Sequence, residues 1–175
     1  DQGEILSLVG ENGAGKSTLM KILSGAYSHE EYTGEILVNG EPKLFKGPLD
    51  SEECGIQMIY QETSAIFDMN IAENIFIGRY PQKKGKGIDW RKVYHDAKEA
   101  LEKVGLDISP REMMRNLSTS QQQLVAIAKA ISANPKILVL DEPTSTLTKA
   151  ESETLFEVLY DLKRRGIACI YISHK

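Results

Sequence analysis

The sequence is poor in cysteine and has no long apolar run. Only two of its 175 residues are cysteine, Cys54 and Cys169, and neither lies at the spacing of a metal site or a CxxC motif. We interpret them as core or spectator thiols of a reducing compartment. No run approaches the roughly 18 apolar residues that cross a bilayer, and no signal-peptide pattern is visible. We therefore expect no membrane-spanning segment in this chain.

An excess of positive charge is also missing. Lysine and arginine number 21 against 25 aspartate and glutamate residues, for a net charge of −4. This balance argues against nucleic acid as the main partner, because nucleic-acid surfaces are usually basic. The hydrophobic content of 41% and the charged content of 26% are typical of a soluble globular protein. Both ends run almost directly into predicted strands, which indicates a piece of a longer protein.

Residues 10–18 read Gly-Glu-Asn-Gly-Ala-Gly-Lys-Ser-Thr, between an apolar strand at 5–9 and a helix that starts at Lys16. They match the phosphate-loop pattern G-x-x-x-x-G-K-[ST], in which backbone N–H groups and a helix N-terminus face one anion. A glycine-rich turn without a ligand is the alternative, but chance gives the pattern in roughly one such chain in a few hundred. Lys16 would contact the β- and γ-phosphates and Ser17 would bind Mg²⁺. The predicted ATP-binding residues are Gly10, Asn12, Gly13, Gly15, Lys16, Ser17 and Thr18.

Short apolar strands alternate with helices in the rest of the chain. Strands are predicted at 34–40, which runs into an Asn-Gly turn, and at 56–60, 137–140 and 167–172. Such alternation predicts an α/β fold with a mostly parallel sheet covered on both faces. Residues 62–134 lack strands and read as an inserted helical subdomain. The predicted division is therefore a P-loop ATPase core at 1–61 and 135–175, with a helical subdomain at 62–134.

An acidic pair ends the predicted strand 137–140. Asp141 would face the crevice where ligands collect in parallel sheets, and there it could hold Mg²⁺ opposite Ser17. Glu142 would then polarise the attacking water, although a surface or helix-entry carboxylate is the alternative. The pair predicts hydrolysis of the bound triphosphate.

With Asp141-Glu142-Pro143-Thr144 and Ile172-Ser173-His174-Lys175 added, the chain resembles the ATP-binding subunits of ABC transporters over essentially its whole length. The resemblance implies the ABC ATPase fold, truncated at both ends, with ATP and Mg²⁺ as ligands. Gln61 resembles the Q-loop glutamine, which touches Mg²⁺ and water, and His174 resembles the switch histidine, which contacts the γ-phosphate. The implied catalytic residues are Glu142, His174 and Gln61, and the implied metal ligands are Ser17, Gln61 and Asp141.

Residues 117–121, Leu-Ser-Thr-Ser-Gln, are similar to the ABC signature, usually LSGGQ. In the family this helix start, here Ser118, Ser120 and Gln121, closes on the γ-phosphate held by a second ATPase domain. Thr148 stands where most relatives have the aspartate of Ser-Ala-Leu-Asp. The residues that differ from the usual pattern, Thr119-Ser120 in the signature and Thr148, are similar to those in the tandem ATPase subunits of bacterial monosaccharide importers. Residues 27–36 particularly resemble the xylose-type members. We expect part of the N-terminal ATPase domain of such a subunit.

The resemblance also implies partners and location: a second ATPase domain, a membrane permease and, indirectly, a periplasmic or extracellular sugar-binding protein, at the cytoplasmic face of the inner membrane. The adenine-stacking aromatic residue of the family would lie upstream of this chain. A soluble ABC-type ATPase of DNA repair or translation is one alternative, although only about a hundred residues separate phosphate loop and signature, too few for a long coiled coil. A non-hydrolysing nucleotide sensor is the other, and it would be expected to lack Glu142 or His174.

Overall fold

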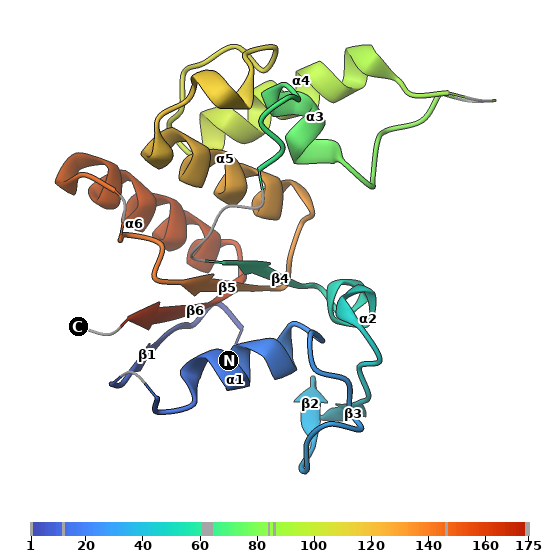
Figure 1. The fold of residues 1–175 in the computed structure, drawn as a ribbon, viewed down its shortest axis with the longest axis vertical. Helices are drawn as coiled ribbons and strands as arrows, with labels where there is room; N and C mark the ends of the chain where they lie inside the picture. Colours follow the sequence, from blue (N-terminus) through green and yellow to red (C-terminus); the bar gives the residue numbers. More distant parts are fainter. Residues whose placement is uncertain are drawn as a thin grey trace. The chain divides into compact units, whose positions relative to one another are not determined.

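The computed structural model describes residues 2–11, 13–60, 65–83, 85, 87–145 and 147–173 (Figure 1). Within them the chain forms two compact units. One, called here the sheet unit, comprises Asp1–Met58, Pro135–Glu142 and Leu162–Lys175, and the other, the helical unit, comprises Ile59–Asn134 and Pro143–Asp161. The predicted boundaries at 61 and 135 stay a prediction. None of the helices in the described part of the chain is long and apolar enough to cross a membrane.

A four-stranded sheet forms the centre of the sheet unit, in the order β1-β6-β5-β4. The strands are β1 (Ile5–Val9), β4 (Ile56–Ile59), β5 (Ile137–Asp141) and β6 (Ala168–Ser173). Strand β6 pairs in parallel with both β1 and β5, which confirms the α/β fold with a parallel sheet. The carboxyl ends of β1, β5 and β6 therefore lie at one edge of the sheet, called here the carboxyl edge.

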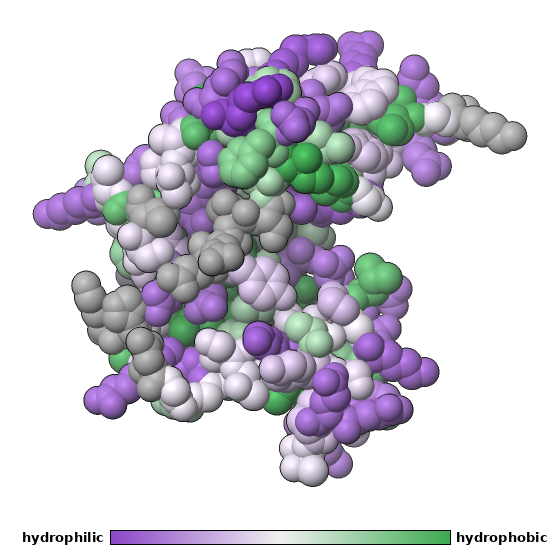
Figure 2. Space-filling model, viewed as in Figure 1, coloured by the Kyte–Doolittle hydropathy of each residue, from purple (hydrophilic) through white to green (hydrophobic). Residues whose placement is uncertain are grey.

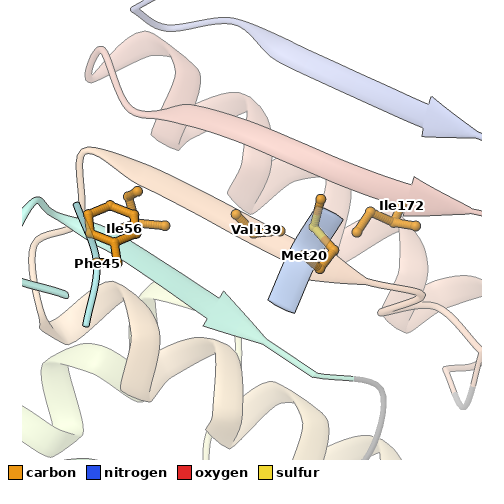
Figure 3. Packing of buried hydrophobic residues seen from close by; sticks show 5 residues of the cluster. All are labelled: Met20, Phe45, Ile56, Val139 and Ile172. Atoms are coloured by element: carbon orange, nitrogen blue, oxygen red, sulfur yellow. The ribbon is translucent and has the colours of Figure 1, made fainter. Parts of the chain in front are cut away.

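One face of the sheet carries a buried core that includes helix α1 (Lys16–Leu23) (Figure 3). Met20 of α1 lies in a cluster with Phe45, Ile56, Val139 and Ile172, all nearly inaccessible to solvent. Val139 faces this cluster, while its neighbours Leu138 and Leu140 are buried on the opposite face by the alternation of a strand. The continuous apolar run of β5 is thus explained by burial on both faces.

Beyond α1 the sheet unit has a hairpin of β2 (Ile36–Val38) and β3 (Glu41–Lys43), then the short helix α2 (Pro48–Glu53). The turn residues Asn39 and Gly40 both have positive φ, 54° and 78°, as the Asn-Gly pair predicted. Gly25 ends the α1 region at φ 70°, and a Cβ there would lie 2.4 Å from the carbonyl oxygen of Gly47. This glycine is required both by its backbone angle and by the close approach of another segment.

The helical unit is built from α3 (Ile71–Phe76), α4 (Trp90–Lys103), the 3₁₀ turn η1 (Met114–Asn116), α5 (Thr119–Ser132) and most of α6 (Lys149–Arg164). Helices α3, α4 and α5 pack against one another. Arg79 connects the end of α3 to α5 by hydrogen bonds. Its guanidinium donates to the carbonyl oxygen of Lys129, and it also donates to Ser132 Oγ at a distance of 2.8 Å. Figure 2 shows hydrophilic residues spread across the viewed face, with hydrophobic residues in small groups.

Candidate nucleotide-binding site

The phosphate loop connects β1 to α1 and leaves the start of that helix open. Gly13 and Gly15 have φ of 87° and 88°, and Gly15 is the N-cap of α1 without any side-chain cap. No acidic residue lies in the first turn. By contrast, α3, α4 and α5 each begin with a side chain that accepts a hydrogen bond from the helix backbone. The exposed N–H groups at the start of α1 are therefore available to an anion.

Lys16 lies inside the loop that precedes it. Its Nζ donates to the carbonyl oxygens of Gly10 at 2.5 Å and Glu11 at 3.0 Å. Ser17 and Thr18, the next two residues of α1, are exposed. The ammonium group is thus already held at the loop before any phosphate arrives, which reduces the entropy cost of ordering it on binding.

Strand register brings the acidic pair to the same edge as the phosphate loop. Ile172 is the pairing partner of both Leu8 in β1 and Asp141 in β5. The loop starts two residues after Leu8, and Glu142 follows Asp141 directly, so both segments leave the carboxyl edge on either side of β6. This is the edge at which ligands bind in parallel α/β sheets.

The electrostatics of the edge connect the same residues. Burial raises the pKa of the Asp141 carboxyl, and the neighbouring Glu142 raises it further, while the charge of Lys16 acts in the opposite direction. Two carboxylates and one ammonium group therefore interact at the carboxyl edge. A partly buried carboxylate whose charge is incompletely compensated is a favourable place for a cation.

Glu142 has an unusual backbone conformation. Among the described residues, three that are not glycine have positive φ: Asn39, Asn134 and Glu142. Asparagine tolerates this region, whereas glutamate seldom occupies it. The Glu142 N–H donates to the carbonyl oxygen of Ile172 at 3.2 Å. Non-glycine residues in this conformation cluster at functional sites, where the surrounding structure maintains the strain.

The signature segment lies in the helical unit, at the start of α5. Ser118 is its N-cap, with Oγ accepting from Gln121 N at 3.3 Å, while Ser118 N donates to Gln121 Oε1 at 2.9 Å. These two hydrogen bonds form a capping box, as the Ser-x-x-Gln pattern at 118–121 favours. A second one begins α6, where Thr148 and Glu151 exchange hydrogen bonds of the same kind. The caps fix both helix starts and leave Ser118 and Ser120 near the open end of α5.

Comparison with known proteins decides the family. A family model described as ABC transporter matches residues 1–145, well over half of the chain. The chain belongs to the ABC transporter family. It is 55% identical, over 99% of its length, to the xylose import ATP-binding protein XylG of Moorella thermoacetica, and 49% identical over 99% to the ribose import ATP-binding protein RbsA of Rhodopirellula baltica. The chain spans about a third of the length of these relatives, 34% in each case.

Solved ABC transporter cassettes share the fold. The ADP conformation of the ATP-binding cassette MJ1267 superposes with a TM-score of 0.83 at 27% identity, covering 99% of this chain and 71% of that one. A dimeric post-hydrolysis cassette, MJ0796 bound to ADP and Pi, gives a TM-score of 0.81 at 26% identity, covering 100% and 76%. The resemblance to the ATP-binding subunits of ABC transporters is thereby confirmed.

The structure of this ABC transporter domain brings together part of the predicted site. Gly10, Lys16, Asp141 and Glu142 gather at the carboxyl edge, with Gly13, Gly15, Ser17 and Thr18 in the same loop and helix start. Ser118, Ser120 and Gln121 form their own group at the start of α5. Asn12, Gln61 and His174 lie outside the described residues, and the roles given to them stay predictions.

Sequence reasoning missed one feature of the signature group. The hydroxyls of Ser118 and Ser120 lie 3.0 Å apart, and Ser120 lies close enough to Glu151 to help lower the pKa of that carboxyl. Ser120 and Glu151 are 31 positions apart in the sequence. No spacing rule would have found this contact, because it depends on how α5 and α6 meet within the helical unit.

Proposed function

We propose that the chain binds and hydrolyses ATP as part of a subunit that powers sugar import through a membrane permease. The main support for this proposal is the strand register, in which Ile172 pairs with both Leu8 and Asp141. This register aligns the end of β1, which precedes the phosphate loop, with the end of β5, which precedes Glu142. Uncapped N–H groups, an ammonium group and two carboxylates thus collect at one edge. That donor and acceptor set suits a triphosphate with a divalent cation.

In the proposed site the backbone amides after Gly13 and the Lys16 ammonium bind the β- and γ-phosphates. Lys16 exchanges its hydrogen bonds to Gly10 and Glu11 for phosphate oxygens. The hydroxyl of Ser17 and the carboxylate of Asp141, with Gln61, would hold Mg²⁺, since all are hard oxygen ligands. When bound, that ion would neutralise charge on the transferring phosphoryl group.

Glu142 is proposed to orient and activate the attacking water, and His174 to contact the γ-phosphate. Water attacks the γ-phosphorus, the bond to the ADP oxygen breaks, and Glu142 accepts the water proton. The backbone of Glu142 is held by its hydrogen bond to Ile172. This bond fixes the point from which the side chain of Glu142 extends, so that less freedom is lost when the water is positioned.

The start of α5 is proposed to serve a second ATP. Ser118, Ser120 and Gln121 would contact the γ-phosphate held by another ATPase domain, so that two domains close head to tail over two ATP molecules. The dimeric relative bound to ADP and Pi supports this arrangement. The second domain would be the other half of a tandem subunit, consistent with relatives about three times as long as this chain.

The sugar class is inferred from the names of the relatives. These include xylose, ribose, galactose and L-arabinose import or transport proteins at 45% to 55% identity. We therefore propose a monosaccharide importer, with xylose as the first substrate to test. The subunit would sit at the cytoplasmic face of the inner membrane, attached to a permease that receives sugar from a binding protein.

The deciding experiment compares Glu142→Gln with the wild type in the complete protein assembled with its permease. We expect ATP binding to be retained and phosphate release to fall by about 10²- to 10⁴-fold, the usual worth of a general base. Glu157→Gln, which changes an exposed carboxylate on α6, is the matched control and should retain full turnover. Wild-type turnover by Glu142→Gln would remove Glu142 from catalysis, and purification without any permease would favour a soluble ABC-type ATPase.

A further inference from the structure

A cavity of about 590 Å³ opens on the surface of the helical unit. It is lined by Glu73 of α3, by Trp90, Arg91 and Tyr94 of α4, and by Arg111 of the loop before η1. Its volume lies within the roughly 300–1,000 Å³ that is usual for small-molecule sites. None of the described residues assigned to ATP lines this cavity, which is called here the arginine pocket.

Aromatic side chains form one wall of the arginine pocket. Trp90 contacts both Tyr80 and Tyr94, with ring centroids 5.7 and 6.1 Å apart respectively. These contacts hold the indole ring in place, although Trp90 is 42% exposed to solvent. An exposed ring that is already ordered loses little freedom when a ligand packs on it. Its π face attracts the weakly positive C–H groups on one side of a sugar ring.

Two guanidinium groups bring positive charge to the pocket without a carboxylate partner. In the described part of the chain neither Arg91 nor Arg111 takes part in an ion pair, and Glu73 lies beyond ion-pair distance of both. Arg111 Cζ lies 3.8 Å from the centre of the Tyr94 ring. This stacking occupies the flat face of the guanidinium and leaves the N–H groups in its plane available. Arginine binds phosphate oxygens through such N–H groups, often in parallel pairs.

The carboxylate of Glu73 adds an acceptor to the same pocket. Its Oε2 accepts from the Asn70 N–H at 2.9 Å as part of the capping box of α3, while Oε1 has no hydrogen bond among the described residues. A carboxylate only accepts hydrogen bonds, so Oε1 suits a ligand hydroxyl and repels a phosphate. A ligand that carries both groups would thus turn its phosphate to the two arginines and a hydroxyl to Glu73.

We propose that the arginine pocket binds a small hydroxylated phosphate ester, the class of a sugar phosphate. Arg91 and Arg111 bind the phosphate, Glu73 accepts from a hydroxyl, and the Trp90 ring packs against the sugar. Inorganic phosphate would leave the indole ring and the carboxylate unused, and a sugar without phosphate would leave both guanidinium groups unpaired. The site goes beyond the proposed function, which places ATP at the carboxyl edge and assigns no ligand to this pocket.

The test measures binding to the complete protein by calorimetry, with ribose 5-phosphate as the probe. We expect Arg91→Ala and Arg111→Ala each to weaken its binding by about 10- to 150-fold, the worth of a hydrogen bond to a charged group. Both side chains are exposed, so the variants should fold normally. Arg115→Ala is the matched control, because this exposed arginine pairs with Asp68 at 3.5 Å and does not line the pocket, and it should bind the probe normally.

Further arms of the experiment define the ligand and the site. Ribose and inorganic phosphate should each bind about 10-fold more weakly than ribose 5-phosphate, or weaker still, because each lacks one set of contacts. Trp90→Ala should weaken binding of ribose 5-phosphate more than binding of inorganic phosphate. Lys16→Ala alters the phosphate loop and should leave binding of the probe unchanged. Vesicles that contain phosphatidylglycerol should not compete with the probe.

Several results would overturn the inference. These are no binding of ribose 5-phosphate, equal losses in Arg111→Ala and Arg115→Ala, or loss of binding in Lys16→Ala, which would place the probe in the nucleotide site. Equal binding of inorganic phosphate would remove the sugar from the assignment, and competition by the vesicles would indicate a membrane surface in place of a soluble ester. ATP binding is measured on the same samples. Its absence would overturn the proposed function alone, so the two failures are distinguishable.

Discussion

The backbone of Glu142 offers a test that separates the stability of the site from its activity. With φ at 46°, this residue lies in the left-handed region, which costs a residue with a Cβ roughly 1–2 kcal/mol. Glycine avoids that cost but loses about 0.5–1 kcal/mol more chain entropy on folding. The difference predicts that Glu142→Gly raises the free energy of unfolding by about 0.5–1 kcal/mol. The same substitution should abolish hydrolysis.

The measurement is urea unfolding of the wild type and the variant without nucleotide, with phosphate release assayed in parallel. A gain of this size corresponds to a Tm increase of about 1–4 °C for a chain of this length. Glu157→Gly is the matched control: it replaces an exposed glutamate inside helix α6, where glycine costs about 1 kcal/mol. The two glycine variants should thus move stability in opposite directions.

A shared loss of stability would refute the reasoning. It would mean that Glu142 occupies its conformation at no cost, or that its side chain contributes more to the fold than the strain removes. In either case the left-handed backbone could not be taken as a sign that the site sacrifices stability for function.

Two further predictions concern the charges at the carboxyl edge. Lys16→Ala should weaken ATP binding, measured by calorimetry, by about 10- to 150-fold, since one hydrogen bond to a charged group is worth about 1.5–3 kcal/mol. The control Lys21→Ala, on the same helix, should bind ATP normally. Equal losses of affinity in both variants would refute a specific contact between Lys16 and phosphate. Burial and Glu142 raise the pKa of Asp141, so its contribution to stability is largest below about pH 4 and is lost as pH rises through the folded-state pKa. Asp141→Asn, unfolded in urea with EDTA, should therefore become more stable relative to wild type from pH 4 to 8, and a constant difference would contradict this.

Much of the sheet unit was predictable because local signals agree with the fold. The predicted strand 137–140 is β5, Ile137–Asp141, since a fully buried strand must be apolar along its whole length. The phosphate loop was equally clear, because its motif has fixed spacing and the positive φ of its second fixed glycine, Gly15, requires that residue type. The helix starts at Ser118 and Thr148 are also encoded locally, because a capping box involves residues only three positions apart.

Other features depend on contacts that no local pattern encodes. Helix α2, Pro48–Glu53, is too short to show a helical period, so no helix was predicted there from the sequence. The hydrogen bonds from Lys16 Nζ to Gly10 and Glu11 depend on how the loop closes. The left-handed backbone of Glu142 is imposed by its surroundings against the preference of glutamate. Two of these three features lie in the candidate site, where local preference and the required geometry most often conflict.

The position of β6 explains why two distant motifs form one site. The phosphate loop and the acidic pair lie about 125 residues apart in the chain, counted from Lys16 to Asp141. They meet because β6, which comes last, pairs with β1 on one side and β5 on the other. A one-residue shift of β6 against either neighbour would move Leu8 out of line with Asp141, and it would turn the buried Ile172 to the opposite face. Burial of Ile172 with Met20 and Val139 therefore fixes the register of the core and, through it, the spacing of the groups proposed to bind and hydrolyse ATP.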